Sequence, residues 1–301
     1  MFNKVCIIGL GLIGSSLARN IKAHNLAAHL TCVDLNPKVC EKGMELGIVD
    51  QATTSFSVGV ENADLVIISA PVGAMGVVAS AIAEYIKSDA IVTDVGSVKG
   101  SVVRDLKEHL PDTVEIVPGH PIAGTEHSGP EAGFEELFRD RWVILTPLPE
   151  TSLRAVDRVS AIWDACGAKI EIMDAKRHDL ILGITSHLPH LIAYSIVDTA
   201  NDLEEDTKSE VIKYSASGFR GFTRIAASDP VMWRDVFMNN QEAVLEILQR
   251  FTEDLSALQK AIRKGDGDYL FNVFSRTRDI RRRVIERGEE TLPSPERKGK
   301  D

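Results

Sequence analysis

The sequence predicts an α/β protein in which an N-terminal doubly wound domain is followed by an all-α C-terminal domain. Two observations lead to this fold class. Strand-like apolar stretches alternate with helix-like segments over residues 1–172, which is typical of a mostly parallel sheet covered by helices on both faces. After Met173 the strand-like stretches stop and helical patterns take over. We therefore expect one domain over residues 1–172 and a second over residues 173–287.

A glycine motif follows the first predicted strand directly. Gly9, Gly11 and Gly14 have the GxGxxG spacing, and Leu12 and Ile13 begin the helix that comes next. In dinucleotide-binding folds the first glycine makes a tight turn, the second lets the backbone approach a pyrophosphate, and the third lets the helix pack closely on the strand. The N-terminus of the helix offers unpaired N–H donors to the phosphates.

An acidic residue stands where such a motif needs one. The second predicted strand, Leu30–Val33, ends in Asp34, which lies about 20 residues after Gly14. A carboxylate at this position accepts a hydrogen bond from a ribose 2′-hydroxyl and repels a 2′-phosphate. An ordinary glycine-rich turn is the alternative, but it explains neither the strand nor the acid. The sequence therefore predicts a Rossmann-type domain that binds NAD.

The remaining elements follow from the same patterns. Besides Val5–Ile8 and Leu30–Val33, the predicted strands are Leu65–Ser69, Ala90–Thr93, Glu115–Val117, Val143–Leu145 and Lys169–Ile172. The predicted helices between them are Pro37–Leu46, Val77–Ile86, Gly100–Leu110 and Leu153–Ala165. In the second domain the predicted helices are Ala175–Ile184, one that resumes after Pro189, and a long one over Asn239–Arg263.

The long helix carries apolar residues at spacings of three, four and seven, which form one stripe along its surface. Such a stripe packs in a core or against a second copy of the chain. We therefore expect a homodimer formed through the helical domain. Residues 288–301 are polar and contain prolines, and this composition predicts a disordered tail.

Composition excludes several classes of partner. The chain of 301 residues has 34 basic and 44 acidic side chains, and a net charge of −10 disfavours binding to nucleic acid. Its four cysteines form no CxxC pair, which is typical of reduced thiols in a cytoplasmic protein. We find no leader and no apolar run long enough to cross a bilayer, so we expect no membrane partner.

Three junctions that follow predicted strands carry candidate functional residues, since ligands of doubly wound folds lie beyond the carboxyl ends of the strands. Ser69, Ala70 and Pro71 follow the third strand and can form a wall beside the ribose or nicotinamide. Ser97 follows the fourth strand, close to the start of a helix, where it can also serve as a helix cap. His120 follows the fifth strand, where flanking glycines and a proline can hold it over the nicotinamide; an ordinary loop histidine is the alternative.

The helical half contains a second group of candidates. Ser186, His187 and His190 lie around Pro189, which cannot donate to a helix and therefore predicts a kink or a helix start. The sequence disfavours a metal site of the His-x-x-His type, because no acidic or thiol ligand has suitable spacing nearby. We therefore expect no metal.

Two arginines, Arg220 and Arg224, occur in a glycine-rich turn. A guanidinium group binds carboxylates through paired, charge-assisted hydrogen bonds, so either side chain could hold an anionic ligand. Surface ion pairs with Asp229 or Asp235 are the alternative.

Taken together, these residues resemble the prephenate dehydrogenase family, which includes arogenate and cyclohexadienyl dehydrogenases. The resemblance extends from the glycine motif to about residue 285. The motifs that carry it are Asp94–Gly100, Gly119–Glu126, Ser186–His190, Phe222–Ala226 and Asp229–Trp233.

The resemblance implies NAD(P)-linked oxidative decarboxylation of prephenate, arogenate or both in tyrosine biosynthesis, with a helical domain for dimerisation and substrate binding. His120 matches the catalytic histidine of the family, and Ser97 matches a hydroxyl that helps to place substrate and histidine. Arg224 matches the arginine that holds a substrate carboxylate. The other matches to the substrate pocket are Thr125, Glu126, Ser186, His187, His190 and Trp233. Gly221 is a departure, because some relatives carry an acid before the Phe-Thr-Arg sequence.

Three other hypotheses remain to be weighed. A β-hydroxyacid dehydrogenase needs a lysine base followed four positions later by asparagine, but Lys176 is followed by Leu180. A non-catalytic NAD-binding regulatory protein should have lost catalytic residues, whereas His120, Ser97 and Arg224 are all present. A strict arogenate dehydrogenase stays open, because no residue of the sequence distinguishes the keto from the amino side chain.

Overall fold

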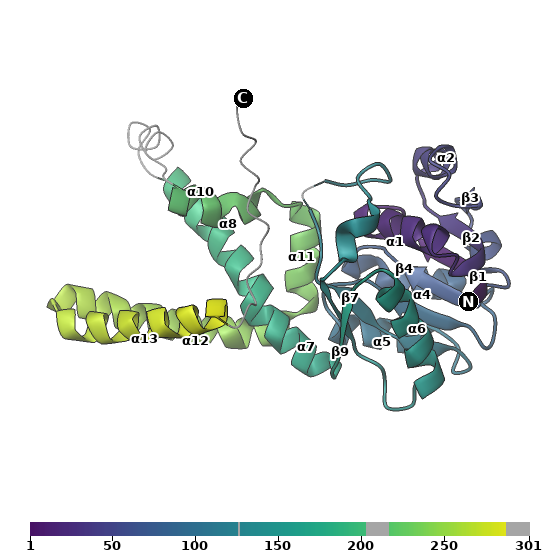
Figure 1. Ribbon diagram of the computed structural model, residues 1–301. Coiled ribbons are helices and arrows are strands. Elements are labelled where there is room, and N and C mark those ends of the chain that lie inside the picture. Colours follow the sequence, from purple (N-terminus) through teal and green to yellow (C-terminus); the bar gives the residue numbers. More distant parts are fainter. Residues whose placement is uncertain (126, 203–216, 287–301) are drawn as a thin grey trace, which may run out of the picture. The chain divides into compact units, whose positions relative to one another are not determined.

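The computed structural model describes residues 1–125, 127–202 and 217–286 (Figure 1). Contacts divide the described residues into two compact units, one within Met1–Leu245 and one within Glu246–Asp301. The candidate site lies in the first unit. The domain boundary near residue 172 stays a prediction. Glu126 and the predicted disordered tail, residues 288–301, lie outside the described residues.

Six parallel strands form the main sheet of the first unit, in the order β3-β2-β1-β4-β5-β6. They are β1 (Phe2–Ile8), β2 (Ala27–Val33), β3 (Gln51–Thr53), β4 (Leu65–Ile68), β5 (Ile91–Asp94) and β6 (Glu115–Val117). This is the strand order of a Rossmann fold, and the chain reverses direction across the sheet between β1 and β4. All residues of β4 and β5 are buried, as expected for parallel strands covered on both faces. The predicted fold class is confirmed.

Helices cover both faces of this sheet (Figure 1). The first half contains α1 (Leu12–Ala23), α2 (Pro37–Glu45), α3 (Phe56–Val60), a short 3₁₀ turn η1 (Val72–Ala74), α4 (Met75–Ile82) and α5 (Gly100–His109). One apolar cluster includes Leu17 of α1 and Trp163 of α6 (Leu153–Ala165), and a second includes Val78 of α4 and Leu106 of α5. The two clusters are the two halves of a core split by the sheet.

A separate three-stranded sheet holds β7 (Gly119–Pro121), β8 (Trp142–Leu145) and β9 (Lys169–Ile172), and a 3₁₀ turn η2 (Glu135–Phe138) precedes β8. β7 runs antiparallel to β8, while β9 is parallel to β8. Assigning β8 and β9 to the main sheet was therefore wrong, and β3 and β7 were not predicted. Both missed strands have three residues and lack the apolar alternation that marks a strand. β7 is nevertheless important, because it contains His120.

The helices that follow are α7 (Ala175–Leu182), a π-helical turn η3 (Gly183–His187), α8 (Leu188–Asn201), α10 (Ser217–Thr223), a 3₁₀ turn η4 (Arg224–Ala227) and α11 (Pro230–Asn239). Pro189 is in the first turn of α8, which agrees with the predicted helix start, and a π turn precedes it. Turns of this kind are frequent at functional sites.

The π turn makes the stretch Ala175–Asn201 continuous. With 27 residues it is, among the described helices, the one long and apolar enough to cross a membrane by length and composition. No run of this length was expected from the sequence. Three polar side chains of this stretch, His178, Asp179 and His187, are buried, and 28% of its most apolar window is buried in the structure.

The long helix α12 (Gln241–Lys264) is followed by α13 (Gly267–Glu286). Val244 and Ile247 near the start of α12 are buried. Further along, several large apolar side chains of the two helices are exposed, namely Leu255, Ile262, Phe271, Phe274 and Ile280. Large exposed apolar side chains, where they gather in one patch, mark interfaces with other chains.

Candidate active site

The glycine turn has the geometry that the sequence predicts. Gly9 has φ +95°, and a Cβ atom there would lie 2.5 Å from the carbonyl oxygen of Ser69. A Cβ atom on Gly14 would lie 2.1 Å from the carbonyl oxygen of Gly9, so a side chain at either position would clash with backbone. Gly11 differs, because a Cβ atom there would meet nothing within 4 Å. The second glycine, Gly11, therefore faces open space at the N-terminal end of α1.

The surroundings of this turn fit a dinucleotide. Helix α1 begins after Gly11 with Leu12 and Ile13, has no side-chain cap and has no acidic residue in its first turn, so its N–H groups are available to phosphate. Asp34 lies beside the turn, where its Oδ2 accepts from the backbone N–H of Leu10 at 3.0 Å and its Oδ1 accepts from that of Asn36 at 3.0 Å. These bonds orient the carboxylate and leave each oxygen a further lone pair for a ribose hydroxyl.

On the other side of the turn, Ser69 and Ala70 follow β4 and are partly buried, while Pro71 is exposed and precedes η1. These residues lie at the carboxyl end of β4, next to β1, where the strand order reverses. That these residues form a wall beside the ribose or nicotinamide stays a prediction.

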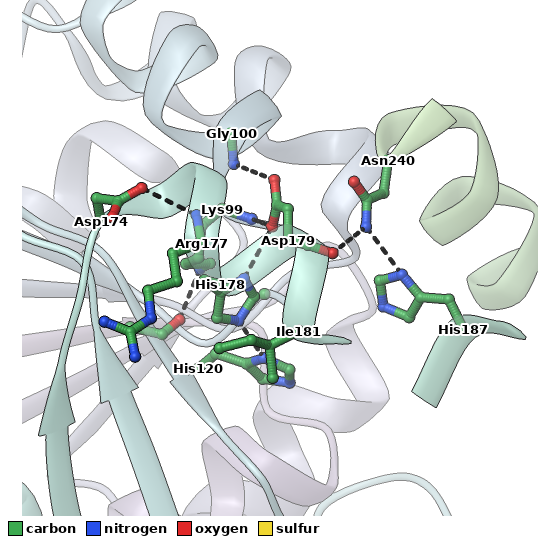
Figure 2. Close-up of polar contacts among 12 residues, drawn as sticks. Lys99, Gly100, His120, Asp174, Arg177, His178, Asp179, Ile181, His187 and Asn240 are labelled. Carbon is green, nitrogen blue, oxygen red and sulfur yellow. Dashed lines mark hydrogen bonds and ion pairs between the residues drawn. The ribbon is translucent and has the colours of Figure 1, made fainter. Parts of the chain in front are cut away.

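His120 is held by a second histidine that the sequence analysis did not single out. Its Nδ1 atom lies 2.8 Å from Nε2 of His178, which is fully buried in α7 (Figure 2). Nδ1 of His178 lies in turn 2.8 Å from Oδ1 of Asp179. His120 is partly buried in β7. The three side chains therefore form a continuous chain from a carboxylate to the candidate base.

Asp179 also fixes the loop that precedes α5. Its Oδ1 accepts from the backbone N–H of Lys99 at 2.8 Å, and its Oδ2 accepts from that of Gly100 at 2.8 Å. The carboxylate thus satisfies N–H groups at the start of α5, the role that the sequence analysis gave as the alternative for Ser97. Ser97 is partly buried in this loop and makes no hydrogen bond to another described residue.

A buried ion pair braces the backbone next to His120. Lys99 and Asp94 both have fully buried side chains and are in contact, and Lys99 Nζ also donates to the carbonyl oxygen of Gly119 at 2.6 Å. Asp94 Oδ1 accepts from the backbone N–H of Gly119 at 3.1 Å, and its Oδ2 accepts from that of Gly96 at 2.7 Å. The N–H of Gly119 is therefore bonded to the last residue of β5, and its carbonyl oxygen is bonded to Lys99 in the loop that follows β5.

The environment keeps His120 uncharged. Burial is the largest cause that lowers the pKa of His120 well below its ordinary value, and the neighbouring His178, Lys99 and His187 lower it further. Burial likewise lowers the pKa of His178, although Asp179 opposes this shift. An imidazole that is neutral near pH 7 is in the form that a general base requires.

His187 belongs to a second polar group around the backbone of Asp179. Asn240 follows α11, and its Nδ2 donates to the carbonyl oxygen of Asp179 at 3.0 Å and lies 3.0 Å from Nδ1 of His187 (Figure 2). Burial lowers the pKa of His187 to about 4, so the ring is neutral near pH 7. Because Nδ1 accepts from the amide, the single proton of the ring is on Nε2. That atom is buried and has no hydrogen-bond partner in the described chain.

Trp233 of α11 lies between the two histidines of the Ser186–His190 motif. His190 stacks on its ring at a centroid distance of 3.6 Å, and His187 approaches it edge-on at 6.1 Å. The Nε1 atom of Trp233 is also buried without a hydrogen-bond partner in the described chain. His190 Nδ1 lies 2.8 Å from the carbonyl oxygen of Ser186, which is partly buried in the π turn. Two unpaired N–H groups thus remain for a ligand.

Arg224 lies close to His190. The guanidinium group is exposed in η4, and its charge lowers the pKa of His190 after the larger effect of burial. Arg224 makes no hydrogen bond or ion pair with another described residue. The alternative ion pairs do not form, since Asp229 caps α11 through the N–H of Met232 at 2.8 Å and Asp235 pairs with Arg234.

Thr125 is exposed in the segment that follows β7, where its Oγ1 accepts from the backbone N–H of His127 at 3.2 Å. It contacts none of the residues around His120 through a hydrogen bond within the described chain. Glu126, the next residue, is outside the described residues. Within those residues, no group of three His, Cys, Asp or Glu side chains is placed to hold a metal ion.

The sequence analysis missed the residues behind His120, which are Asp94, Lys99, His178, Asp179 and Asn240. One signal was available for the two residues of α7. His178 is one helical turn before the buried Leu182, so it falls on the apolar face of the helix. A histidine and an aspartate on that face need buried partners.

The first unit combines a Rossmann sheet that has an open glycine turn with a neutral, anchored imidazole at the carboxyl end of that sheet. These two features are typical of a nucleotide-dependent dehydrogenase. Comparisons with known proteins give the family. Residues 17–172 match the family model described as prephenate dehydrogenase, nucleotide-binding domain, and residues 174–276 match prephenate dehydrogenase, dimerization domain.

Relatives and solved structures agree with these models. The chain is 43% identical over 281 residues to a cyclohexadienyl dehydrogenase of Zymomonas mobilis, which covers 93% of this chain and 96% of the relative. The structure of prephenate dehydrogenase from Aquifex aeolicus in complex with hydroxyphenyl propionate and NAD⁺ has a TM-score of 0.87 and 35% identity, and covers 94% of this chain and 99% of that one. Synechocystis arogenate dehydrogenase has a TM-score of 0.81 and 26% identity, and covers 93% and 99%. The chain belongs to the prephenate dehydrogenase family and is an oxidoreductase.

Proposed function

We propose that this chain catalyses the NAD-dependent oxidative decarboxylation of prephenate to 4-hydroxyphenylpyruvate, of arogenate to tyrosine, or of both, in tyrosine biosynthesis. The observation that carries the proposal is the neutral His120, anchored at the carboxyl end of a Rossmann sheet in a chain of this family. Relatives with the names cyclohexadienyl dehydrogenase and arogenate dehydrogenase support the inclusion of both substrates.

The glycine turn and its neighbours would hold NAD. The N–H groups of Gly11, Leu12 and Ile13 at the start of α1 would face the pyrophosphate, and Asp34 would accept from the adenosine ribose. Gly9 and Gly14 shape the turn, and Ser69, Ala70 and Pro71 would form the wall beside the nicotinamide half. When bound, NAD accepts a hydride from the substrate.

Residues of the helical segments would hold the substrate. Arg224 has a charged group without a partner in the described chain, which suits a substrate carboxylate. His187 and Trp233 offer buried N–H groups that lack partners, and these suit substrate oxygens. The other side chains proposed to surround the substrate are Ser97, Thr125, Glu126, Ser186 and His190.

His120 would move the proton in this reaction. A cyclohexadienol substrate carries a hydroxyl at C4 and a carboxylate at C1. His120 accepts the hydroxyl proton while C4 is oxidised, and the bond from C1 to its carboxylate then breaks to release CO₂. The electron pair of that bond aromatises the ring, and the proton held by His120 returns to the ring oxygen to give the phenol. Burial favours this cycle because it keeps the imidazole neutral before the reaction.

A direct assay tests the proposed function. Purified protein is supplied with prephenate or arogenate, each with NAD or NADP, and absorbance of the reduced nicotinamide is followed. We expect turnover with NAD, because Asp34 repels a 2′-phosphate. Activity with arogenate alone would establish the strict arogenate dehydrogenase. Absence of turnover with either substrate would contradict the proposal and leave a nucleotide-binding protein.

The assembly and location follow from the same assignment. We propose a homodimer formed by the helical domain, supported by the exposed apolar side chains of α12 and α13 and by the dimerization domain that the family model names.

We also propose that the protein works in the cytoplasm, where its four buried free thiols stay reduced. Residues 1–172 and 173–287 are the proposed domains.

A further inference from the structure

We propose that His178 and Asp179 are positioning residues that hold His120 in the tautomer with its proton on Nδ1, so that Nε2 is the base. This inference rests on the proposed function for its catalytic meaning. The hydrogen-bond geometry itself is independent of any substrate, and therefore a structural test is possible.

The direction of each hydrogen bond follows from Asp179. The backbone N–H groups of Lys99 and Gly100 can only donate, so both oxygens of the Asp179 carboxylate are acceptors. His178 Nδ1, at 2.8 Å from Oδ1, must then be the donor. A neutral imidazole has one N–H, so Nε2 of His178 is an acceptor.

The protonation state of His120 follows from its bond to His178. Its Nδ1 lies 2.8 Å from the acceptor Nε2 of His178, so Nδ1 of His120 carries the proton. Nε2 of His120 is left with a free lone pair on the side of the ring away from His178 (Figure 2). The base therefore has its acceptor directed away from the buried network before any substrate arrives.

The charges around the two rings are consistent with this chain of bonds. His178 faces Asp179, Lys99 and Asp94, and His120 faces His178, Lys99 and His187. Lys99 is paired with Asp94, so its positive charge is balanced inside the core. Burial lowers the pKa of both histidines, and both rings are therefore neutral near pH 7. A proton added to His178 would make its Nε2 a donor and would reverse the tautomer of His120.

The activity test compares two substitutions on α7. His178→Phe keeps a ring of similar size but removes the acceptor, and we expect kcat to fall about 10- to 100-fold, the size expected when a buried N–H loses its partner. The KM for substrate should stay close to that of the original protein, because His178 is fully buried behind His120 and is not among the residues proposed to bind substrate. Lys176→Gln alters an exposed side chain two positions away on the same helix and should leave kcat unchanged. A kcat for His178→Phe equal to that of Lys176→Gln would overturn the inference.

A spectroscopic test does not depend on activity. In the full-length protein labelled with ¹⁵N-histidine, long-range ¹H–¹⁵N correlation spectra distinguish protonated from unprotonated ring nitrogens, and His120→Asn identifies the signals of His120. We expect a protonated Nδ1 and an unprotonated Nε2 for His120 near pH 7. Protonation at Nε2 would overturn the inference, even if His178→Phe does not fold.

The two tests separate the inference from the proposed function. A protein without turnover on either substrate that still shows the Nδ1–H tautomer would contradict the proposed function and support the geometry. A fully active protein with the Nε2–H tautomer would support the function and overturn the role of His178 and Asp179.

Discussion

His120 and His187 are both neutral, partly or fully buried imidazoles linked to the same residue, Asp179, yet they present opposite hydrogen-bonding groups. His120 is connected through His178 to the Asp179 carboxylate, which directs the proton of His120 to Nδ1. His187 is connected through Asn240 to the Asp179 backbone carbonyl, which leaves the proton of His187 on Nε2. The first ring offers an acceptor and the second offers a donor.

The comparison shows that the partner of a histidine determines its chemistry more than the histidine itself. A carboxylate at the end of one network makes a base, and an amide at the end of the other makes a hydrogen-bond donor. We call the residues His120, His178 and Asp179 the base side, and His187, His190, Trp233 and Arg224 the donor side. Changes on the base side should affect kcat, and changes on the donor side should affect KM.

The largest effect is expected on the base side, at His120 itself. His120→Asn removes the proton acceptor while keeping a polar side chain, and we expect kcat to fall by about 10²- to 10⁴-fold. Substrate KM should be largely kept, since the donor side is untouched. Steady-state kinetics with saturating NAD measure both quantities. A kcat near that of the unmodified protein would contradict the assignment of His120.

The next largest effect is on stability, through the ion pair that braces His120. Lys99→Met leaves Asp94 buried without its cation, and we expect the free energy of unfolding to decrease by about 3–5 kcal/mol. Chemical denaturation at pH 7 measures this change. Lys107→Met is the matched control, because Lys107 pairs with Glu150 on the surface. The free energy of unfolding of this variant should be almost unchanged. Equal stability of the two variants would show that the buried pair has no special role.

On the donor side, Arg224 should matter most. Arg224→Ala removes a charged group that is proposed to hold a substrate carboxylate, and we expect KM to rise about 10- to 100-fold with a smaller change in kcat. Arg234→Ala is a suitable control, because that side chain already pairs with Asp235. Unchanged saturation kinetics for Arg224→Ala would remove its proposed role.

The smallest effect is expected at His187. His187→Phe keeps an aromatic ring but removes the Nε2–H donor, together with the Nδ1 acceptor of Asn240, so we expect KM to rise about 3- to 10-fold, the contribution of a neutral hydrogen bond. His187→Gln, whose amide can still donate, should retain most of the affinity. A decrease in kcat with constant KM would place His187 on the base side and would break the comparison.

Local signals in the sequence were enough to predict much of the fold and part of the site. The glycine spacing and Asp34 predicted the nucleotide end, and the geometry of Gly9 and Gly14 agrees with that prediction. The position of His120 after a strand made it a candidate, and its catalytic role was predicted from the resemblance to the family. These residues are recognisable because each acts through its own backbone or its immediate neighbours.

The network behind His120 could not be predicted in the same way, because its bonds join distant parts of the chain. His120 and His178 are 58 positions apart, Lys99 and Asp179 are 80 apart, and Asn240 and Asp179 are 61 apart. Which of these polar residues meet depends on how α7 packs beside the loop before α5. Strand β7 was missed for a different reason, since its sequence Gly119–Pro121 contains a glycine and a proline and no run of apolar residues.

The most direct test of the account is the pH dependence of kcat/KM for the unmodified protein and for His120→Asn. Only neutral His120 can accept the proton, and burial lowers its pKa, so kcat/KM should hold constant down to about pH 6.5, the ordinary value for histidine, and fall only below it. The acidic decrease should be absent from the residual activity of His120→Asn. The same decrease in both proteins, or a midpoint well above about pH 6.5, would contradict the claim that a buried, neutral His120 is the base.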